Sequence, residues 1–187
     1  MRFAITGSHG VGKTSTIDMI ENYLISKEIK PRYNSSKARD LKAAGFGIND
    51  EASDTSELLM AANHISYFTK DNWFNDRSIV DTYAYASYNY DNHVVGITSR
   101  HTINAIYTMC ENFVNRYDAL FFIPIEFEME DDGLRKVDEK YRNDIEERIL
   151  HTLKHENANY HVIKGSMTTR AKQIKTVIED LQKTQHQ

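Results

Sequence analysis

The chain contains very little cysteine and proline. Cys110 is the only cysteine among 187 residues, which also include two prolines and eight glycines. A single cysteine excludes an intrachain disulfide and a zinc site built on several cysteines, and is typical of a reducing compartment. So few prolines and glycines argue against long linkers or disorder. The sequence therefore fits one domain, spanning residues 1–187, better than two.

The sequence also lacks long apolar runs and an excess of positive charge. No stretch reaches the roughly 18 apolar residues of a membrane-spanning helix, and the amino-terminal apolar run is too short for a signal peptide. We therefore expect a soluble, cytoplasmic protein. The net charge of −4 argues against bulk nucleic-acid binding, because such binders usually carry a basic surface.

Short apolar runs typical of buried strands alternate with segments that have the apolar spacing of helices. Strands are expected at residues 3–6, 31–34, 72–76, 119–123 and 160–163. Helices are expected at residues 13–26, 36–44, 54–69, 79–90, 98–117, 137–154 and 168–182. This alternation predicts an α/β fold in three layers, with helices on both faces of a five-stranded parallel sheet. Ligands of such sheets bind beyond the carboxyl ends of the strands.

A complete phosphate-binding motif, G-x-x-x-x-G-K-[ST], lies between the first predicted strand and the first predicted helix. Its glycines allow backbone N–H groups to face phosphate oxygens, and the following helix adds its positive end. In this motif Lys13 contacts the β- and γ-phosphates and the Thr14 hydroxyl binds Mg²⁺. The side chain of His9 is expected to point to solvent. We predict that ATP and Mg²⁺ bind at Gly7, Ser8, His9, Gly10, Val11, Gly12, Lys13, Thr14 and Ser15.

Two absences separate this chain from other classes of P-loop protein. The Asn-Lys-x-Asp string of guanine-binding GTPases is missing. The third predicted strand ends in Asp76 and Arg77, so an arginine stands where hydrolysing ATPases carry a water-activating glutamate. This favours phosphoryl transfer to a bound acceptor over hydrolysis.

Polar residues after the third strand are candidates for the metal and substrate sites. Asp76, at the strand tip, is a second candidate Mg²⁺ ligand. Arg77 has the fork geometry that binds phosphate. Asp81 lies five residues beyond Asp76 and is expected to face the same cleft. Tyr85 is a candidate for lining the acceptor pocket.

These residues carry a family resemblance. The segment Asp76-Arg77-Ser78, followed by Asp81-Thr82-Tyr83-Ala84-Tyr85, resembles the Asp-Arg segment of thymidylate kinases and, less closely, the Glu-Arg-Ser of deoxynucleoside kinases. With the P-loop and a later Asp131-Asp132-Gly133-Leu134-Arg135, the chain resembles the small P-loop kinases and ATPases grouped with nicotinamide-riboside kinase domains, including phage nucleotide-kinase-like proteins. The resemblance spans about residues 1–155 and implies a single P-loop kinase domain.

We interpret the loop that contains Asp131–Arg135 as part of an arginine-bearing lid, at about residues 126–142. There Arg135 and Arg142 would close over the transferring phosphoryl group, neutralise its charge and exclude water. The alternative is a charged surface helix, in which Arg142 pairs with Glu146 at i,i+4.

The acceptor is expected to be a nucleoside monophosphate. A nucleoside acceptor needs a carboxylate after the second strand to deprotonate its hydroxyl, but residues 34–39 contain no acid. A phosphate acceptor needs positive charge and hydroxyls instead, which Ser35, Ser36 and Arg39 supply. We predict ATP-dependent phosphoryl transfer to a (deoxy)nucleoside monophosphate. A nucleoside or nicotinamide-riboside kinase, and a P-loop ATPase or nucleotide-binding regulator, stay open as alternatives, and kinases of this size often form homodimers.

Overall fold

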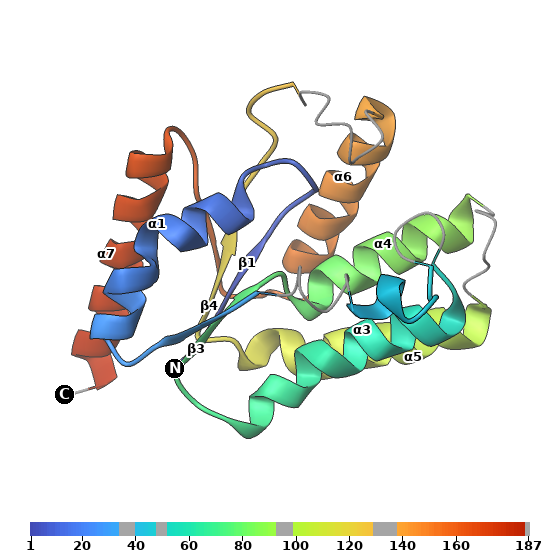
Figure 1. The fold of residues 1–187 in the computed structure, drawn as a ribbon, viewed down its shortest axis with the longest axis horizontal. Helices are drawn as coiled ribbons and strands as arrows, with labels where there is room; N and C mark the ends of the chain where they lie inside the picture. The colour runs from blue at the N-terminus through green and yellow to red at the C-terminus, as the bar shows by residue number, and fades with distance from the viewer. Residues whose placement is uncertain (34–39, 48–51, 93–98, 129–137, 186–187) are drawn as a thin grey trace.

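A parallel β-sheet forms the centre of the molecule (Figure 1). The computed structural model describes residues 1–33, 40–47, 52–92, 99–128 and 138–185. Within these ranges the sheet has five strands in the order β2-β3-β1-β4-β5, with each neighbouring pair parallel. The strands are β1 Arg2–Thr6, β2 Lys30–Arg32, β3 Trp73–Asp76, β4 Ala119–Phe122 and β5 Tyr160–Val162. The sheet expected from the sequence is confirmed.

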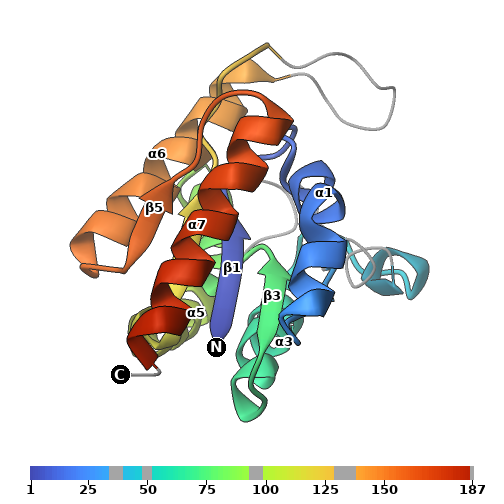
Figure 2. The same ribbon diagram turned by 90° about the vertical axis from the view of Figure 1, so that its left-hand side faces the viewer.

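Helices cover both faces of the sheet and make the fold three-layered. They are α1 Lys13–Ser26, α3 Asp54–Ser66, α4 Ile79–Asp91, α5 Arg100–Phe113, α6 Glu139–His155 and α7 Met167–Gln185. Helices α1 and α7 lie together on one face, which Figure 2 shows in front of β1 and β3. Helices α4, α5 and α6 lie on the other face, where α3 packs against α4 and α5 (Figure 1).

Alternation along β1 divides the hydrophobic core between the two faces. Phe3 and Ile5 join the cluster under α1 and α7, whereas Ala4 joins the cluster under α4, α5 and α6. Successive side chains of a strand point to opposite faces, so a strand covered on both faces is apolar over most of its length. The resulting rigid sheet fixes the positions of the loops at the carboxyl ends of its strands.

Element boundaries differ from the sequence-based expectation by a few residues. The helix expected to continue to residue 117 ends at Phe113 and is followed by the 3₁₀ turn η3, Val114–Arg116. The helix expected to reach residue 69 ends at Ser66, before the 3₁₀ turn η2, Tyr67–Thr69. Of the helix expected at residues 36–44, only residues 40–44 are described, and 40–43 are helical. In the described part of the chain, no helix combines the length and the apolarity that crossing a membrane requires.

Candidate functional site

The phosphate-binding motif forms the connection from β1 to α1, at the carboxyl edge of the sheet. Gly10 and Gly12 have φ angles of 71° and 85°, a region that glycine adopts without strain. A Cβ atom at Gly7 would lie 2.4 Å from the carbonyl oxygen of Ile123, just after β4. Glycine is therefore required there by close packing. No described side chain caps the start of α1, whose N–H groups are thus available to an anion.

The Lys13 ammonium lies inside this loop. Its Nζ donates hydrogen bonds to the carbonyl oxygens of Gly7 and Ser8, at 2.8 and 2.5 Å, and the side chain is buried. A positive charge at the centre of a glycine-rich loop is suited to a polyphosphate. Phosphate oxygens can replace the two carbonyl oxygens as acceptors, because an ammonium group has three donors that reorient freely.

Thr14 and Asp76 meet at the mouth of the loop. Asp76 is the last residue of β3 and pairs in register with Ile5 of β1, so its side chain emerges beside the loop. The Thr14 hydroxyl donates to Asp76 Oδ2 at 3.0 Å. A hydroxyl and a carboxylate are hard oxygen ligands that fit Mg²⁺, which takes one or two protein ligands and completes its coordination with phosphates and water. Among the described residues, no group of three or more His, Cys, Asp or Glu side chains is placed so that it could hold a metal ion.

Arg77 adopts a backbone conformation that is rare for a residue with a side chain. Its φ is 77°, and its N–H donates to the Ile5 carbonyl at 2.9 Å. Such strain is often found at functional sites. The guanidinium stacks on the Tyr85 ring at 5.2 Å. Burial lowers the pKa of Arg77, but Tyr85, Asp81 and Asp76 outweigh this and raise the pKa above its ordinary value, so the group stays charged.

Asp81 does not take the position expected of a substrate contact. Its carboxylate is buried and accepts hydrogen bonds from the Thr6 hydroxyl at 2.7 Å and from the Ser78 N–H and hydroxyl at 2.8 and 3.0 Å. Ser78 and Asp81 form a capping box at the start of α4. The carboxylate also lies 3.4 Å from Arg77 Nη1. Asp81 therefore joins the end of β1 to the start of α4 and is not directed to an open cleft.

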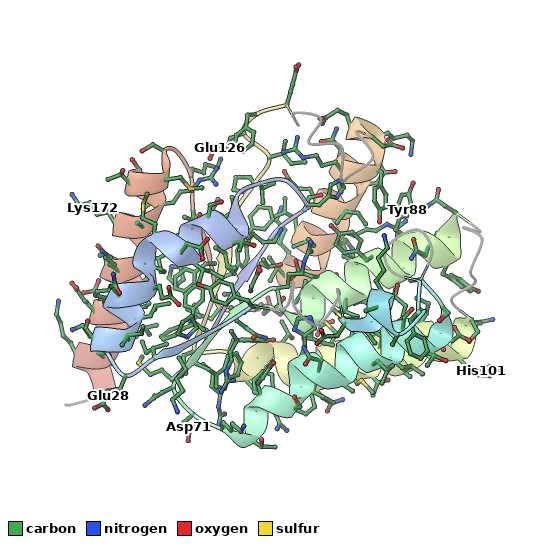
Figure 3. The ribbon with its side chains drawn as sticks, viewed as in Figure 1. Glu28, Asp71, Tyr88, His101, Glu126 and Lys172 are labelled. Atoms are coloured by element: carbon green, nitrogen blue, oxygen red, sulfur yellow. The ribbon has the colours of Figure 1, made fainter. Side chains whose placement is uncertain are left out.

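His9 and Tyr85 contact each other across the loop. His9 Nδ1 lies 3.2 Å from the Tyr85 hydroxyl, and its ring is 5.3 Å from that of Tyr141. The expectation that His9 points to solvent is therefore wrong, because aromatic side chains of α4 and α6 half-bury it. The ring of Tyr88 in α4, which Figure 3 labels, lies 4.7 Å from that of Tyr141. The structure thus brings Tyr85 beside both the loop and Arg77.

Two motif residues turn their side chains away from the loop interior. Val11 is buried in the core under α1 and α7. The Ser8 hydroxyl donates to the carbonyl oxygen of Arg142, 134 residues away. Both residues offer only backbone groups to a nucleotide.

Arg142 lies in the second turn of α6, not in a loop over the phosphate site. Its guanidinium is buried, with Nε 3.3 Å from the His9 carbonyl and Nη1 2.8 Å from the Phe127 carbonyl. The expected lid therefore has a different carboxyl-terminal end, since Glu139–Arg142 belong to the helix. In this structure Arg142 supports the phosphate loop by hydrogen bonds with His9 and Ser8.

Several predicted site residues cannot be placed. Ser35, Ser36, Arg39, Arg135 and the whole Asp131–Arg135 segment lie outside the described residues. Their proposed roles at the acceptor and in the lid therefore stay predictions.

Sequence reasoning missed Arg170 and did not single out Glu126. Arg170 Nη1 donates to the carbonyl oxygen of Val11 at 2.6 Å, and Nη2 to the Glu126 carboxylate at 2.7 Å. The Glu126 carboxylate thus forms an ion pair with a buried arginine. No local pattern could identify the contact, because Arg170 and Val11 are 159 residues apart.

One protein-family model matches most of the chain. The family described as AAA domain, AAA_28, matches residues 2–170. A search of curated proteins finds no match.

Solved structures with a similar fold include NadR, a deoxyadenosine kinase and a thymidylate kinase. NadR in complex with NR has a TM-score of 0.69 at 16% identity, over 96% of this chain and 50% of that one. Deoxyadenosine kinase from M. mycoides has a TM-score of 0.65 at 14% identity, over 96% of this chain and 100% of that one. Thymidylate kinase from Candida albicans also has a TM-score of 0.65 at 14% identity, over 95% and 90%. At these identities the likeness shows the fold.

Proposed function

The chain belongs to the AAA_28 family of AAA domains, and from this premise we propose that it transfers the γ-phosphoryl group of ATP to a (deoxy)nucleoside monophosphate. The observation that carries the proposal is the meeting of four side chains at one edge of the sheet. Lys13 lies in the phosphate loop, Thr14 is hydrogen-bonded to Asp76, and Arg77 follows Asp76 directly. Two positively charged groups, Lys13 and Arg77, and two hard oxygen ligands, Thr14 and Asp76, would thus surround the end of a bound triphosphate.

In the proposed reaction the chain works by positioning and charge neutralisation. Lys13 exchanges its two carbonyl partners for oxygens of the β- and γ-phosphates. Arg77, whose guanidinium lies over the Tyr85 ring, presents its remaining donors to the phosphoryl group or to the acceptor phosphate. Mg²⁺, held by Thr14 and Asp76, would neutralise the charge that develops on the phosphate groups during transfer.

The state of Asp81 supports a phosphorylated acceptor. A nucleoside kinase needs a carboxylate free to take the proton of the acceptor hydroxyl. Asp81 is buried and already accepts hydrogen bonds from Thr6 and Ser78, so Asp76 is the remaining candidate after β3. Because Asp76 also serves the metal site in this proposal, an acceptor that is already anionic suits the site better.

A nucleoside or nicotinamide-riboside acceptor is the second candidate. It is favoured by the similarity of the fold to deoxyadenosine kinase and to NadR in complex with NR. For such an acceptor Asp76 would act as the general base, and a change to asparagine would abolish transfer without abolishing ATP binding.

The decisive experiment is ADP release from MgATP, measured with a panel of nucleosides, nicotinamide riboside and nucleoside monophosphates. We expect turnover to depend on a monophosphate. The Lys13→Ala variant should lose it, whereas Lys172→Ala, at an exposed lysine of α7, should retain it. Dependence on a nucleoside would favour the second candidate. Turnover that no acceptor changes would indicate an ATPase or nucleotide-binding regulator, and the absence of MgATP binding would refute all three.

A further inference from the structure

Two buried arginines, Arg170 and Arg142, donate hydrogen bonds to backbone carbonyls of the phosphate loop. Arg170, in the first turns of α7, donates to the Val11 carbonyl, and Arg142, in α6, donates to the His9 carbonyl. Both guanidinium groups are almost completely buried. Burying two positive charges costs free energy unless each is paired or hydrogen-bonded. Such an arrangement therefore calls for a function that a pair of apolar side chains could not supply.

The two arginines contact carbonyls on either side of Gly10. Peptide bonds are planar, and none of those described is cis, so each C=O points opposite to the N–H of the following residue. Fixing the Val11 carbonyl toward Arg170 directs the Gly12 N–H to the other side of the loop. Fixing the His9 carbonyl toward Arg142 does the same for the Gly10 N–H. A cation on the carbonyl also polarises the peptide and makes its N–H a stronger donor.

Packing leaves this geometry little freedom around Gly12. A Cβ atom on Gly12 would lie 3.3 Å from Arg170 Nη1 and 3.1 Å from Met167 Cε. The first turns of α7 thus press directly against the loop, and the arginine cannot be displaced without moving it.

The same two arginines also bind the segment that follows β4. Arg170 Nη2 donates to Glu126, whose carboxylate accepts the Gly165 N–H at 2.8 and 3.0 Å as well. Burial alone would raise the pKa of Glu126, but the hydrogen bonds from Arg170 and Gly165 lower it below its ordinary value. On the other side Arg142 Nη1 donates to the Phe127 carbonyl. Consecutive residues are thus tied to the loop through separate arginines; Figure 3 labels Glu126 at this edge of the molecule.

We infer that Arg170 and Arg142 are positioning residues, which orient the Gly12 and Gly10 N–H groups toward a polyphosphate and connect the loop to residues 126–127. The inference rests on the proposed function only in naming a polyphosphate as the ligand. Each arginine acts on its own peptide group, so the two effects are separable.

The test uses amide resonances of the nucleotide-free protein together with MgATP affinity. Arg170→Gln should shift the Gly12 amide resonance upfield, because the Val11 carbonyl of the same peptide group no longer accepts a hydrogen bond from a cation. The Gly10 resonance should stay nearly unchanged. Arg142→Gln should do the reverse. Each should weaken MgATP binding by about tenfold or more, the range expected for losing a hydrogen bond to a charged group. Arg2→Gln, which removes the exposed ion pair with Asp71, is the control and should change neither quantity.

Conservative variants keep the test valid if a glutamine variant does not fold. Arg170→Lys keeps the positive charge but has a single nitrogen in place of the two that separately reach Val11 and Glu126, so the Gly12 resonance and the affinity should fall between wild type and Arg170→Gln. Glu126→Gln keeps an acceptor but removes the charge, and should act in the same direction. Unchanged Gly12 and Gly10 resonances in folded variants would overturn the inference. These resonances are measured without nucleotide. If the wild-type protein bound no MgATP, the proposed function would be refuted, but the spectra would still test whether the arginines orient the two N–H groups.

Discussion

The hydroxyl of Thr14 lies 3.0 Å from the Asp76 carboxylate, although the two residues are 62 positions apart. One belongs to the first turn of α1 and the other ends β3, so the parallel pairing of β1 with β3 creates the contact. Two hard oxygen ligands at the mouth of a phosphate loop define a place for Mg²⁺.

Removing either oxygen ligand should raise the Mg²⁺ requirement. For Thr14→Val and Asp76→Asn, we expect the Mg²⁺ concentration at half-maximal ADP release to rise about ten- to hundredfold, the usual cost of disturbing a metal site. Magnesium titration at saturating ATP measures this. Thr14→Ser keeps the hydroxyl and serves as the matched control; a Thr14→Val enzyme with wild-type Mg²⁺ dependence would exclude Thr14 as a ligand.

Loss of the Arg77 charge should reduce turnover by about a thousandfold, the scale of a missing arginine in phosphoryl transfer. We expect Arg77→Gln to do this with little loss of stability, because Asp81 keeps its hydrogen bonds from Thr6 and Ser78. Steady-state kinetics and chemical denaturation measure the two effects. Arg116→Gln also removes an arginine stacked on an aromatic ring, here Phe113 at 4.4 Å, but away from the site. Equal turnover in both variants would contradict the assigned role.

Asp81 should matter for stability more than for ligand binding. Asp81→Ala leaves the buried donors of Thr6 and Ser78 unsatisfied, and we expect the free energy of unfolding to fall by about 3 kcal/mol. Asp81→Asn keeps one acceptor oxygen and should cost less. Urea denaturation gives these values, with the exposed Asp180→Asn as control. A stable Asp81→Ala protein with a lost acceptor affinity would restore the substrate role expected from the sequence.

Glu57 should make stability fall as pH rises. Burial raises the pKa of this α3 carboxyl from 4.5 to about 8, against the smaller lowering effect of the Asn89 hydrogen bond. Between these values the folded protein holds a proton that the unfolded chain has released, so the contribution to stability is complete below pH 4.5 and is lost toward pH 8.

Glu57→Gln removes this titration. The free energy of unfolding of the variant relative to wild type should therefore increase from pH 5 to pH 8, by at most about 1.4 kcal/mol per pH unit. The comparison with wild type cancels the opposite effect of His64, whose pKa is lowered to about 4 by burial and whose contribution is lost as pH falls below 6.5. A pH-independent difference would show that Glu57 titrates normally.

Local patterns were sufficient for the elements and for the phosphate loop. Strands such as β4 are short, continuous apolar runs, because a strand covered on both faces has no polar side. Helix ends were less predictable. The turns of residues 67–69 and 114–116 continue the preceding helices as 3₁₀ structure. Whether the last turn of a helix is α or 3₁₀ depends on packing at the helix end.

The sequence by itself determined the loop from Gly7 to Thr14, because these eight consecutive residues contain all of its phosphate-binding groups. It also determined that Asp76 would end a strand and that Arg77 would follow it. Only the tertiary structure decided what Asp81, Arg142 and Arg170 contact. Their partners Thr6, His9 and Val11 lie 75, 133 and 159 residues away. Contacts over such separations depend on the order of the strands and the packing of the helices, and no spacing along the chain encodes them.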